Sequence, residues 1–459
     1  MNSTSFKVQF LGAASTVTGS KYLLEYQDKK ILIDCGLFQG EKSLRLLNWN
    51  IPHYDPKEID FVLLTHGHLD HTGYLPRLVK LGFKGDIYGT YPTLDVAKII
   101  LKDTAHIQES EARRANKEGY SKHQPALAFY TTKDVKNTIK LFKGMPQSQW
   151  INSFEGLKIR FQYSGHILGA TFIELDLNGK RVVFSGDIGR TDDLLLYPPL
   201  RPKRADILFM ESTYGGKFHQ EEKETIPEME KIINETFKRG GSLFVPSFSV
   251  ERAQLLMYII WKLRKENKIP KVQMILDSPE GASILKLFKN NREWHKLTQQ
   301  ECKEMCSVFH IVKSYKETLK LRDNNTPKIV IAGSGMLTGG RILNYLERAA
   351  VKKNNTLLFV GYQAKGTRGR RLIEGDRELK VYGKKVPFHM HVEEISGLSA
   401  HADDKELMHW LGKIENKPKK VFLVHGEVEA ATALKSEIEK RFSWACKIPE
   451  LYSKEEISL

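Results

Sequence analysis

Short apolar runs alternate with turn residues over roughly the first two hundred positions of the chain. The segments 7–12, 21–26, 30–36 and 60–65 are rich in apolar and β-branched residues and have the length of strands. The runs 172–177 and 181–187 flank Asn178, Gly179 and Lys180, where Asn-Gly predicts a hairpin turn with positive φ. The segment 93–119 is amphipathic at its start and mostly charged toward its end, which predicts a long helix.

From about residue 210 the pattern changes to strands that alternate with helices. Predicted strands at 242–248, 272–278 and 355–362 are separated by helical segments, which include 222–240 and 250–268. Such alternation is typical of βαβ units and a parallel sheet. After about residue 395 there remain a helix, one apolar strand and a terminal helix. Because this single unit is too small to fold alone, we expect it to pack onto an earlier domain.

Composition narrows the choice of partner and compartment. The chain of 459 residues has 71 Lys and Arg against 55 Asp and Glu, a formal charge of +16. A basic surface attracts polyanions such as nucleic acid, although a merely solvated surface is the alternative. The four cysteines are scattered, which fits a reducing compartment and argues against a cysteine zinc site. Without an apolar signal or a bilayer-length run, we expect a cytoplasmic protein with no membrane partner.

The segment His66-Gly67-His68-Leu69-Asp70-His71 directly follows a predicted strand and contains four potential metal ligands. Imidazole and carboxylate groups need partners when they are buried, so four of them in six residues cannot all be ordinary core residues. A loop at a strand end can turn such side chains toward one point, and Gly67 would give that turn its backbone freedom. The alternative is a solvated, histidine-rich loop.

Three further candidates repeat one pattern, an apolar strand followed by a glycine-flanked His or Asp. They are His166, Asp187 and His425. Strand ends in α/β layers converge along one edge of a sheet, which is where sites are built. A single such residue is more often structural, but the repetition favours a shared metal site.

At these residues the sequence resembles the metallo-β-lactamase superfamily, whose signature is H-x-H-x-D-H followed by a distant His, Asp and His. Glu211 in FMESTYG, His401 in GLSAHAD and His425 in LVHGE resemble the additional motifs of the β-CASP nucleases. That branch includes the endonuclease subunit of the eukaryotic pre-mRNA cleavage and polyadenylation complex and its bacterial and archaeal RNase relatives. The segments 332–341 and 361–372 are also similar to this branch, so the resemblance spans nearly the whole chain.

The resemblance implies an α/β fold, namely a metallo-β-lactamase αβ/βα sandwich with an inserted β-CASP domain built on a parallel sheet. The sandwich would comprise residues 1–209 and 396–459, and the insertion residues 210–395. The family pattern assigns His66, His68 and His166 to one zinc ion, Asp70, His71 and His425 to a second, and Asp187 to a bridge between them. Manganese or iron would also suit these ligands. Asp34 would accept a hydrogen bond from a ligand histidine, or else simply cap a turn.

By resemblance, the expected reaction is hydrolysis of a phosphodiester by water that two metal ions activate. His401 would be the general acid, and Glu211 would hydrogen-bond to it and keep it protonated. The alternative for His401 is a helix N-terminal residue without a role in the reaction. Because water is the nucleophile, products with 5′-phosphate ends are expected.

Candidate RNA contacts lie in the inserted block. A loop between a strand and a helix can bind phosphate through backbone N–H groups, although it could also be only a tight turn. A glycine-spaced basic run and one arginine that opens a helix would contact the RNA backbone or order the domain interface. These residues are Ser334, Gly335, Met336, Thr338 and Gly339 in the loop, Lys365, Arg368, Arg370 and Arg371 in the basic run, and Arg252.

The favoured function is therefore a metal-dependent ribonuclease that acts on single-stranded RNA, with endonucleolytic cutting as the expectation. A DNA nuclease of the same family is the nearest alternative, but the DNA-repair branch typically carries Val where this chain has His425. A small-molecule hydrolase needs no inserted block of this size, and the intact ligand positions argue against an inactive RNA-binding scaffold. A homodimer is compatible with the sequence. His106, His123, His219, His389 and His391 lack a motif context, and we expect none of them to be a ligand.

Overall fold

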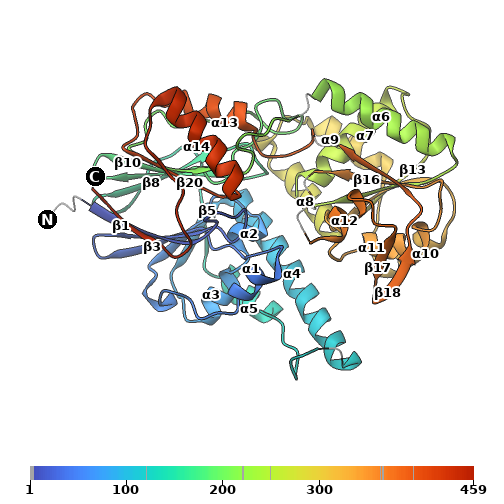
Figure 1. Ribbon diagram of the computed structural model, residues 1–459, viewed down its shortest axis with the longest axis horizontal. Helices are drawn as coiled ribbons and strands as arrows, with labels where there is room; N and C mark the ends of the chain where they lie inside the picture. The colour runs from blue at the N-terminus through green and yellow to red at the C-terminus, as the bar shows by residue number, and fades with distance from the viewer. Residues whose placement is uncertain are drawn as a thin grey trace. The chain divides into compact units, whose positions relative to one another are not determined.

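The computed structural model describes residues 5–119, 121–219, 222–248, 250–361, 363, 366–395 and 397–458. The chain forms two compact units (Figure 1). Unit 1 comprises residues up to Phe218 together with those from His401 onward, and unit 2 comprises His219–Ala400. The limits of unit 2 differ slightly from the limits predicted above for the inserted domain, residues 210–395. The extent of that domain stays a prediction.

Unit 1 contains two seven-stranded sheets that pack face to face. In spatial order the first sheet consists of β22 (Lys454–Ser458), β1 (Ser5–Gly12), β2 (Lys21–Tyr26), β3 (Lys29–Ile33), β4 (Phe61–Leu63), β5 (Asp86–Thr90) and β6 (Phe142–Met145). The second consists of β21 (Cys446–Lys447), β20 (Lys420–Val424), β11 (Ile207–Glu211), β10 (Lys180–Phe184), β9 (Thr171–Leu177), β8 (Leu157–Tyr163) and β7 (Ile151–Phe154). The predicted hairpin turn joins β9 to β10, with positive φ at Asn178 and Gly179.

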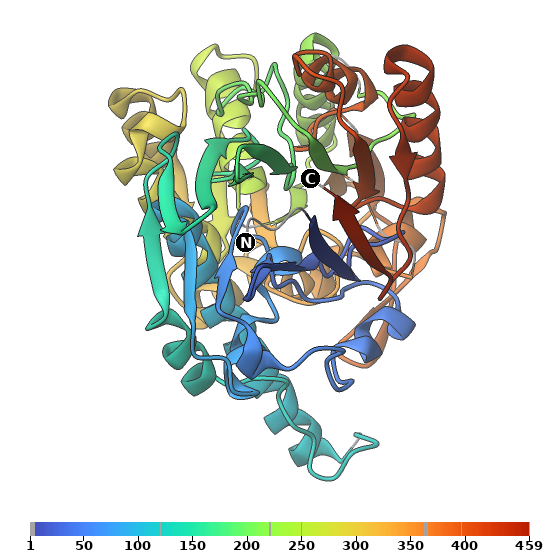
Figure 2. The same ribbon diagram turned by 90° about the vertical axis from the view of Figure 1, so that its left-hand side faces the viewer.

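Helices cover the outer faces of both sheets, so that unit 1 is the expected four-layer sandwich. An apolar core lies between the sheets, a second lies under α3–α5, and a third under α13 and α14. The helices are α1 (Lys42–Leu47), α2 (Leu69–Thr72), α3 (Leu75–Lys80), α4 (Tyr91–Glu118), α5 (Thr132–Ile139), α13 (Asp404–Leu411) and α14 (Val428–Phe442). The first half of α4 is packed, whereas its charged end extends away from the sheets (Figure 2).

The segment after residue 400 joins both sheets of unit 1. β20 pairs in parallel with β11, and β22 pairs antiparallel with β1. The prediction that this segment packs onto an earlier domain is confirmed. The segment is larger than the single βα unit that was predicted, because it also contains β21 and β22. β22 has a charged sequence and only Ile457 is buried, which is the pattern of an edge strand and gives little hydrophobic signal.

Unit 2 is built on a six-stranded parallel sheet, as the alternating pattern predicts. Its spatial order is β14 (Phe309–Ile311), β13 (Gln273–Asp277), β15 (Lys328–Gly333), β12 (Leu243–Ser247), β16 (Thr356–Val360) and β19 (His391–Ile395). A two-stranded hairpin, β17 (Glu378–Val381) and β18 (Lys384–Pro387), lies outside this sheet. The helices are α6 (Glu222–Lys238), α7 (Arg252–Lys265), α8 (Pro279–Asn290), α9 (Gln299–Val308), α10 (Tyr315–Asp323), α11 (Ile342–Ala349) and α12 (Arg368–Ile373).

Within the described ranges, no helix combines the length and the apolar composition that crossing a bilayer requires. The four cysteines are all free thiols, and Cys35 and Cys302 are buried.

Candidate metal centre

The candidate ligands of unit 1 follow the carboxyl ends of strands in both sheets. His66 and His68 lie in the loop after β4, and Asp70 and His71 lie in α2, which begins directly after His68. In the second sheet, His166 follows β8, Asp187 follows β10 and His425 follows β20. These three strands all point the same way. Parallel strands bring their carboxyl ends to one edge of a sheet. Here these three residues meet the four that follow β4 of the first sheet.

Left-handed backbone residues turn the chain immediately after several of these strands. Gly165 and Gly186, which precede His166 and Asp187, have φ values of 72° and 52°. Asp34 and His425 adopt the same region themselves, with φ values of 57° and 49°. Such a conformation is unfavourable for a residue with a side chain, and it persists where surrounding contacts enforce it, as at functional sites.

Gly67 has a different role from the one its sequence context suggested. Its φ is not positive, so backbone freedom is not the reason for glycine. A Cβ atom at this position would lie 2.6 Å from Val96 and 3.0 Å from the backbone nitrogen of Ala97. Gly67 is therefore required because α4 passes directly against the loop.

Four of the candidates form a first ligand set, made up of His66, His68, His166 and Asp187. His68 Nδ1 lies 3.1 Å from His66 Nε2 and 3.2 Å from His166 Nε2. Asp187 Oδ2 lies 3.5 Å from Nε2 of His66 and from Nε2 of His166. The lone pairs of four atoms thus converge on one point.

Asp70, His71 and His425 form a second ligand set. The Nε2 atoms of His71 and His425 are 3.2 Å apart, and Asp70 Oδ2 lies 3.4 Å from His425 Nε2. The second oxygen of Asp187, Oδ1, lies 3.4 Å from His71 Nε2. Asp187 therefore presents one oxygen to each set, which is the arrangement of a bridging carboxylate.

Two threonine hydroxyls link ring nitrogens of this cluster to buried carboxylates. Thr65 Oγ1 donates to Asp34 (2.8 Å) and can accept from Nδ1–H of His66 (3.1 Å). Thr213 Oγ1 donates to Glu211 (2.6 Å) and can accept from Nδ1–H of His425 (3.2 Å). In both relays a proton on Nδ1 leaves the Nε2 lone pair free to face the cluster.

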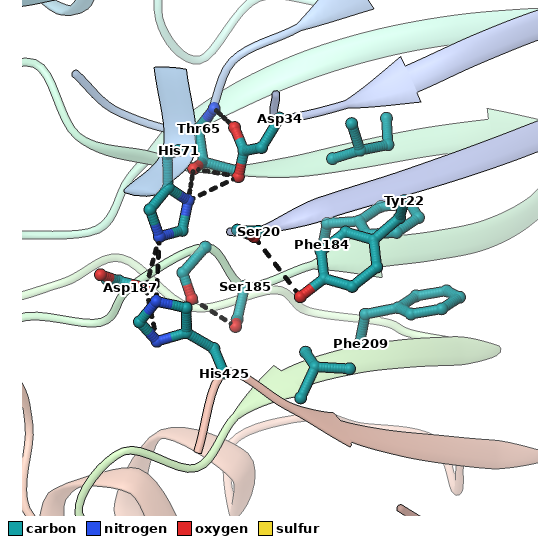
Figure 3. A pocket seen from close by; sticks show the side chains of 13 residues that line it. Ser20, Tyr22, Asp34, Thr65, His71, Phe184, Ser185, Asp187, Phe209 and His425 are labelled. Carbon is teal, nitrogen blue, oxygen red and sulfur yellow. Dashed lines mark hydrogen bonds and ion pairs between the residues drawn. The ribbon is translucent and has the colours of Figure 1, made fainter. Parts of the chain in front are cut away.

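Asp34 also contacts the second set directly. It accepts a hydrogen bond from Nδ1–H of His71 at 2.7 Å and another from the backbone N–H of Thr65 at 2.8 Å. Figure 3 shows Asp34, Thr65 and His71 on one side of the cluster, Asp187 and His425 on the other, and the rings of Tyr22, Phe184 and Phe209 beside them. This apolar surrounding strengthens electrostatic interactions within the cluster.

The protonation states suit metal binding at three positions. Burial, together with neighbouring histidines, holds the pKa of His66 well below its usual value, and burial lowers the pKa of His68 to about 4. Burial opposes ionisation of Asp70, but the hydrogen bond from His425 and nearby histidines bring its pKa down to about 2. His71 differs, because Asp187 and Asp34 outweigh its burial and raise its pKa well above normal. A metal at His71 Nε2 would displace a proton.

His401 and Glu211 lie beside the cluster. Glu211 ends β11 and is fully buried, and His401 pairs with Gly189 through an isolated bridge just before α13. His401 Nδ1 is 3.3 Å from Glu211 Oε2, and His401 Nε2 is 3.9 Å from Asp187 Oδ2. Burial opposes the imidazolium form, but Glu211 and the neighbouring carboxylates raise the pKa of His401 to about 9.

The sequence-predicted RNA contacts form a separate group in unit 2. Ser334, Gly335, Met336, Thr338 and Gly339 lie in the loop between β15 and α11, Arg252 begins α7, and Arg368, Arg370 and Arg371 lie in α12. Lys365 lies outside the described residues. Arg370 and Arg371 pair with Glu374 and Asp376, while Arg368 donates to the carbonyls of Leu337 and Thr338.

The five histidines without a motif context stay outside the ligand sets of the described chain. Thr65 and Thr213 are the contacts that the sequence analysis missed. Thr65 directly precedes His66, and Thr213 lies two residues after Glu211, so each is next to a motif residue. Their hydrogen-bond partners, however, can be distant in the sequence, as His425 is from Thr213.

Three family models match the chain. The metallo-β-lactamase superfamily model matches residues 16–93, the Beta-Casp domain model matches 253–372, and the Zn-dependent metallo-hydrolase RNA specificity domain model matches 385–449.

The chain is also similar to curated relatives over nearly its whole length. It is 33% identical to Ribonuclease TTHA0252 of Thermus thermophilus, covering 92% of this chain and 94% of that protein. It is 30% identical to Transcription termination factor FttA of Methanocaldococcus jannaschii, covering 96% of this chain and 70% of that protein. A crystal structure of a protein of unknown function from Enterococcus faecalis has a TM-score of 0.55 at 14% identity, covering 99% of this chain and 100% of that one, which is a likeness of fold alone.

Proposed function

Because this chain belongs to the β-CASP family of the metallo-β-lactamase superfamily, we propose that it is a metal-dependent ribonuclease that cuts phosphodiester bonds within single-stranded RNA. The observation that carries the proposal is the pair of ligand sets that share Asp187. A hydrolase with two adjacent metal sites is suited to phosphate esters, because two cations can hold both the attacking and the leaving oxygen.

The distances between ligand atoms support a metal in each set. Bonds of about 2.0–2.2 Å in a tetrahedral site place neighbouring ligand atoms about 3.3–3.6 Å apart. The separations here are 3.1–3.5 Å. Asp187 Oδ1 is buried and satisfied by no hydrogen bond within the described chain, while ring nitrogens of His71 and His425 lie 3.4 Å from it. An oxygen in this position is suited to a metal ion.

We propose two zinc ions as the cofactors. His66, His68 and His166 would hold one, Asp70, His71 and His425 the other, and Asp187 would bridge them. Nitrogen and carboxylate ligands without thiolate are typical of catalytic zinc, and manganese or iron would suit the same donors. When bound, the metals supply activated water and offset the negative charge that develops on the phosphate.

His401 is proposed as the proton donor to the departing 3′-oxygen. Its Nδ1 faces Glu211, which leaves Nε2 as the nitrogen that can deliver a proton. Glu211 is held in place by the backbone N–H of Ile188 and by Thr213, so it can orient His401 without itself moving. Since water rather than a 2′-hydroxyl attacks, the products should carry 5′-phosphate ends.

The loop of unit 2 is proposed to hold the RNA backbone. Its carbonyls accept from Gln363, from the backbone N–H of Gly369 and from Arg368. By contrast, the amides of Gly335, Met336 and Thr338 have no protein acceptor among the described residues. Amides left free in a fixed loop are suited to phosphate oxygens. The role proposed for Arg368 is to order this loop, and the other basic residues would contribute charge.

The test uses purified protein with zinc and three substrates of equal sequence, namely linear RNA labelled at its 5′ end, circular RNA and single-stranded DNA. We expect both RNAs to be cut, with 5′-phosphate ends, and the DNA to be spared. Cutting of DNA alone would favour a DNA nuclease. Active preparations without bound transition metal, or full activity after His68→Ala, would overturn the proposal.

We also propose that the protein forms a homodimer and lies in the cytoplasm. A homodimer can be tested by sedimentation of the purified protein. A cytoplasmic location rests on the few unpaired cysteines, and fractionation of cells tests it.

A further inference from the structure

Phe248 is an exposed aromatic residue at the carboxyl end of the unit 2 sheet. The preceding strand β12 is completely buried, but the side chain of Phe248, the next residue, is 49% exposed. Ligands of open parallel sheets bind outside the carboxyl ends of the strands. A large apolar ring that is left in solvent at this place is suited to a flat partner.

The ring of Phe248 rests on the loop that has the free amides. A Cβ atom at Gly335 would lie 2.9 Å from two ring atoms of Phe248, so only glycine leaves room for the ring there. Gln363, which is 4% exposed, donates to the carbonyl of Gly335 at 3.1 Å and fixes this contact from the other side. The ring therefore has a rigid support.

Phosphate-binding features lie next to this ring. The amides of Gly335, Met336 and Thr338 have no acceptor within the described ranges, and Ser334 Oγ orders the turn by accepting from Gly339 N–H at 3.1 Å. Unit 2 is also the more basic part of the chain, with 32 Lys and Arg against 21 Asp and Glu over residues 219–400. An aromatic face beside phosphate donors in a basic domain is the combination that single-stranded nucleic acids require.

We propose that Phe248 and the 334–340 loop form a nucleotide subsite, in which one unpaired base stacks on the Phe248 ring and its phosphate binds the loop amides. This inference rests on the proposed ribonuclease function and adds a reason for single-strand preference. A base can reach the face of a protein ring only when it is unpaired and splayed from its neighbours. Stacking is tolerant of sequence, so the subsite would select strandedness rather than a particular base.

A double-mutant cycle between protein and RNA tests the subsite. The metal-loaded protein carries His401→Ala to prevent cutting, and its affinity for a short labelled RNA is measured by fluorescence anisotropy. Replacing Phe248 by Leu should weaken binding by about 5–100-fold, the range expected for one stacked base, while Phe248→Trp should keep the affinity of the parent. Each base of the RNA is then replaced in turn by an abasic spacer. At one position the spacer should weaken binding to the parent but change binding to Phe248→Leu less than about twofold.

The controls separate this inference from the function on which it rests. Tyr382→Leu removes another exposed ring of unit 2, in the turn of the β17–β18 hairpin, and should leave affinity unchanged. If the protein with Phe248 intact neither binds nor cuts RNA, the proposed function fails. If it cuts RNA but Phe248→Leu binds as tightly as the parent, or if every spacer acts equally on both proteins, the stacking subsite is overturned. A change of sedimentation with Phe248→Leu would instead assign the ring to a protein contact.

Discussion

The candidate sites of both units lie where strands of a sheet end. The metal edge of unit 1 is formed by the two ligand sets that share Asp187, and the loop edge of unit 2 by Phe248 and residues 334–340. The metal edge uses side chains, whereas the loop edge uses mainly the backbone. At the metal edge, ligand side chains that follow β4, β8, β10 and β20 converge, and buried carboxylates orient ring nitrogens directly or through a threonine. At the loop edge, three backbone amides make no hydrogen bond within the described residues, and one ring, that of Phe248, is exposed. We propose that the first arrangement concentrates charge for chemistry, whereas the second offers fixed donors to a nucleotide. Substitutions at the two edges should therefore separate rate from affinity.

Asp187→Asn should have the largest effect. The amide keeps the shape but cannot bridge two cations, so we expect bound zinc to fall and activity to drop by about 10⁴-fold or more. Metal analysis of the purified variant gives the first result and single-turnover cleavage gives the second. RNA affinity should change much less. Retention of two equivalents of zinc together with full activity would contradict the bridging role.

His401→Ala should lower kcat by about 10²–10⁴-fold, the usual contribution of a positioned general acid. Both metals should remain bound, because His401 belongs to neither ligand set. Cleavage at saturating RNA and metal content are measured on the same preparation. His106→Ala, at an exposed position of α4, is the matched control and should leave both values unchanged. Loss of zinc in His401→Ala would show that the residue is a ligand instead.

Thr213→Val should weaken metal binding by about 10–100-fold, because His425 loses the acceptor that fixes its tautomer. Thr213→Ser retains the hydroxyl and should behave as the parent protein does. Competition with a chelator measures the affinity for each metal. Equal affinities for the Val and Ser variants would remove Thr213 from the relay.

Arg368→Met should have the smallest effect and belongs to the other edge. It removes the two hydrogen bonds that hold the carbonyls of Leu337 and Thr338, and we expect KM for RNA to rise by about 10-fold while kcat stays within about twofold. Steady-state cleavage with a titrated RNA gives both constants. Arg348→Met, at an exposed residue of α11 whose ion pair is long at 4.0 Å, serves as the control. A fall in kcat alone would mean that the two edges cannot be separated in this way.

The sequence predicts the metal edge well because each candidate ligand follows an apolar strand, and strand direction decides where such ends meet. Asp34 illustrates this, since its place after β3 brings it within 2.7 Å of His71. The hydrogen bonds of the two threonines were not predictable from the sequence. The hydroxyl of Thr213, for example, contacts His425, which follows a strand more than two hundred residues away. β22 was missed for another reason. Edge pairing with β1 needs only one buried residue, and hydrophobic periodicity does not detect that.

At the loop edge, the basic residues make contacts within the protein that their sequence pattern does not predict. Arginines in a glycine-spaced run suggest contacts with RNA, yet Arg368 is occupied with the protein's own backbone, and Arg370 and Arg371 have acidic neighbours in the same segment. The sequence context of Gly67 in unit 1 also suggested the wrong reason for a glycine. This residue is needed for close packing against α4 rather than for a turn with unusual backbone angles.

The return of the chain to unit 1 after unit 2 has a consequence for biosynthesis. Asp187 is translated long before His425, and at about 5–20 residues per second the ribosome needs roughly 10–50 s to make the intervening segment. During that interval a nascent chain has its first ligand set but not the second. Both ligand sets can therefore be complete only late in synthesis, after all of unit 2 has been made.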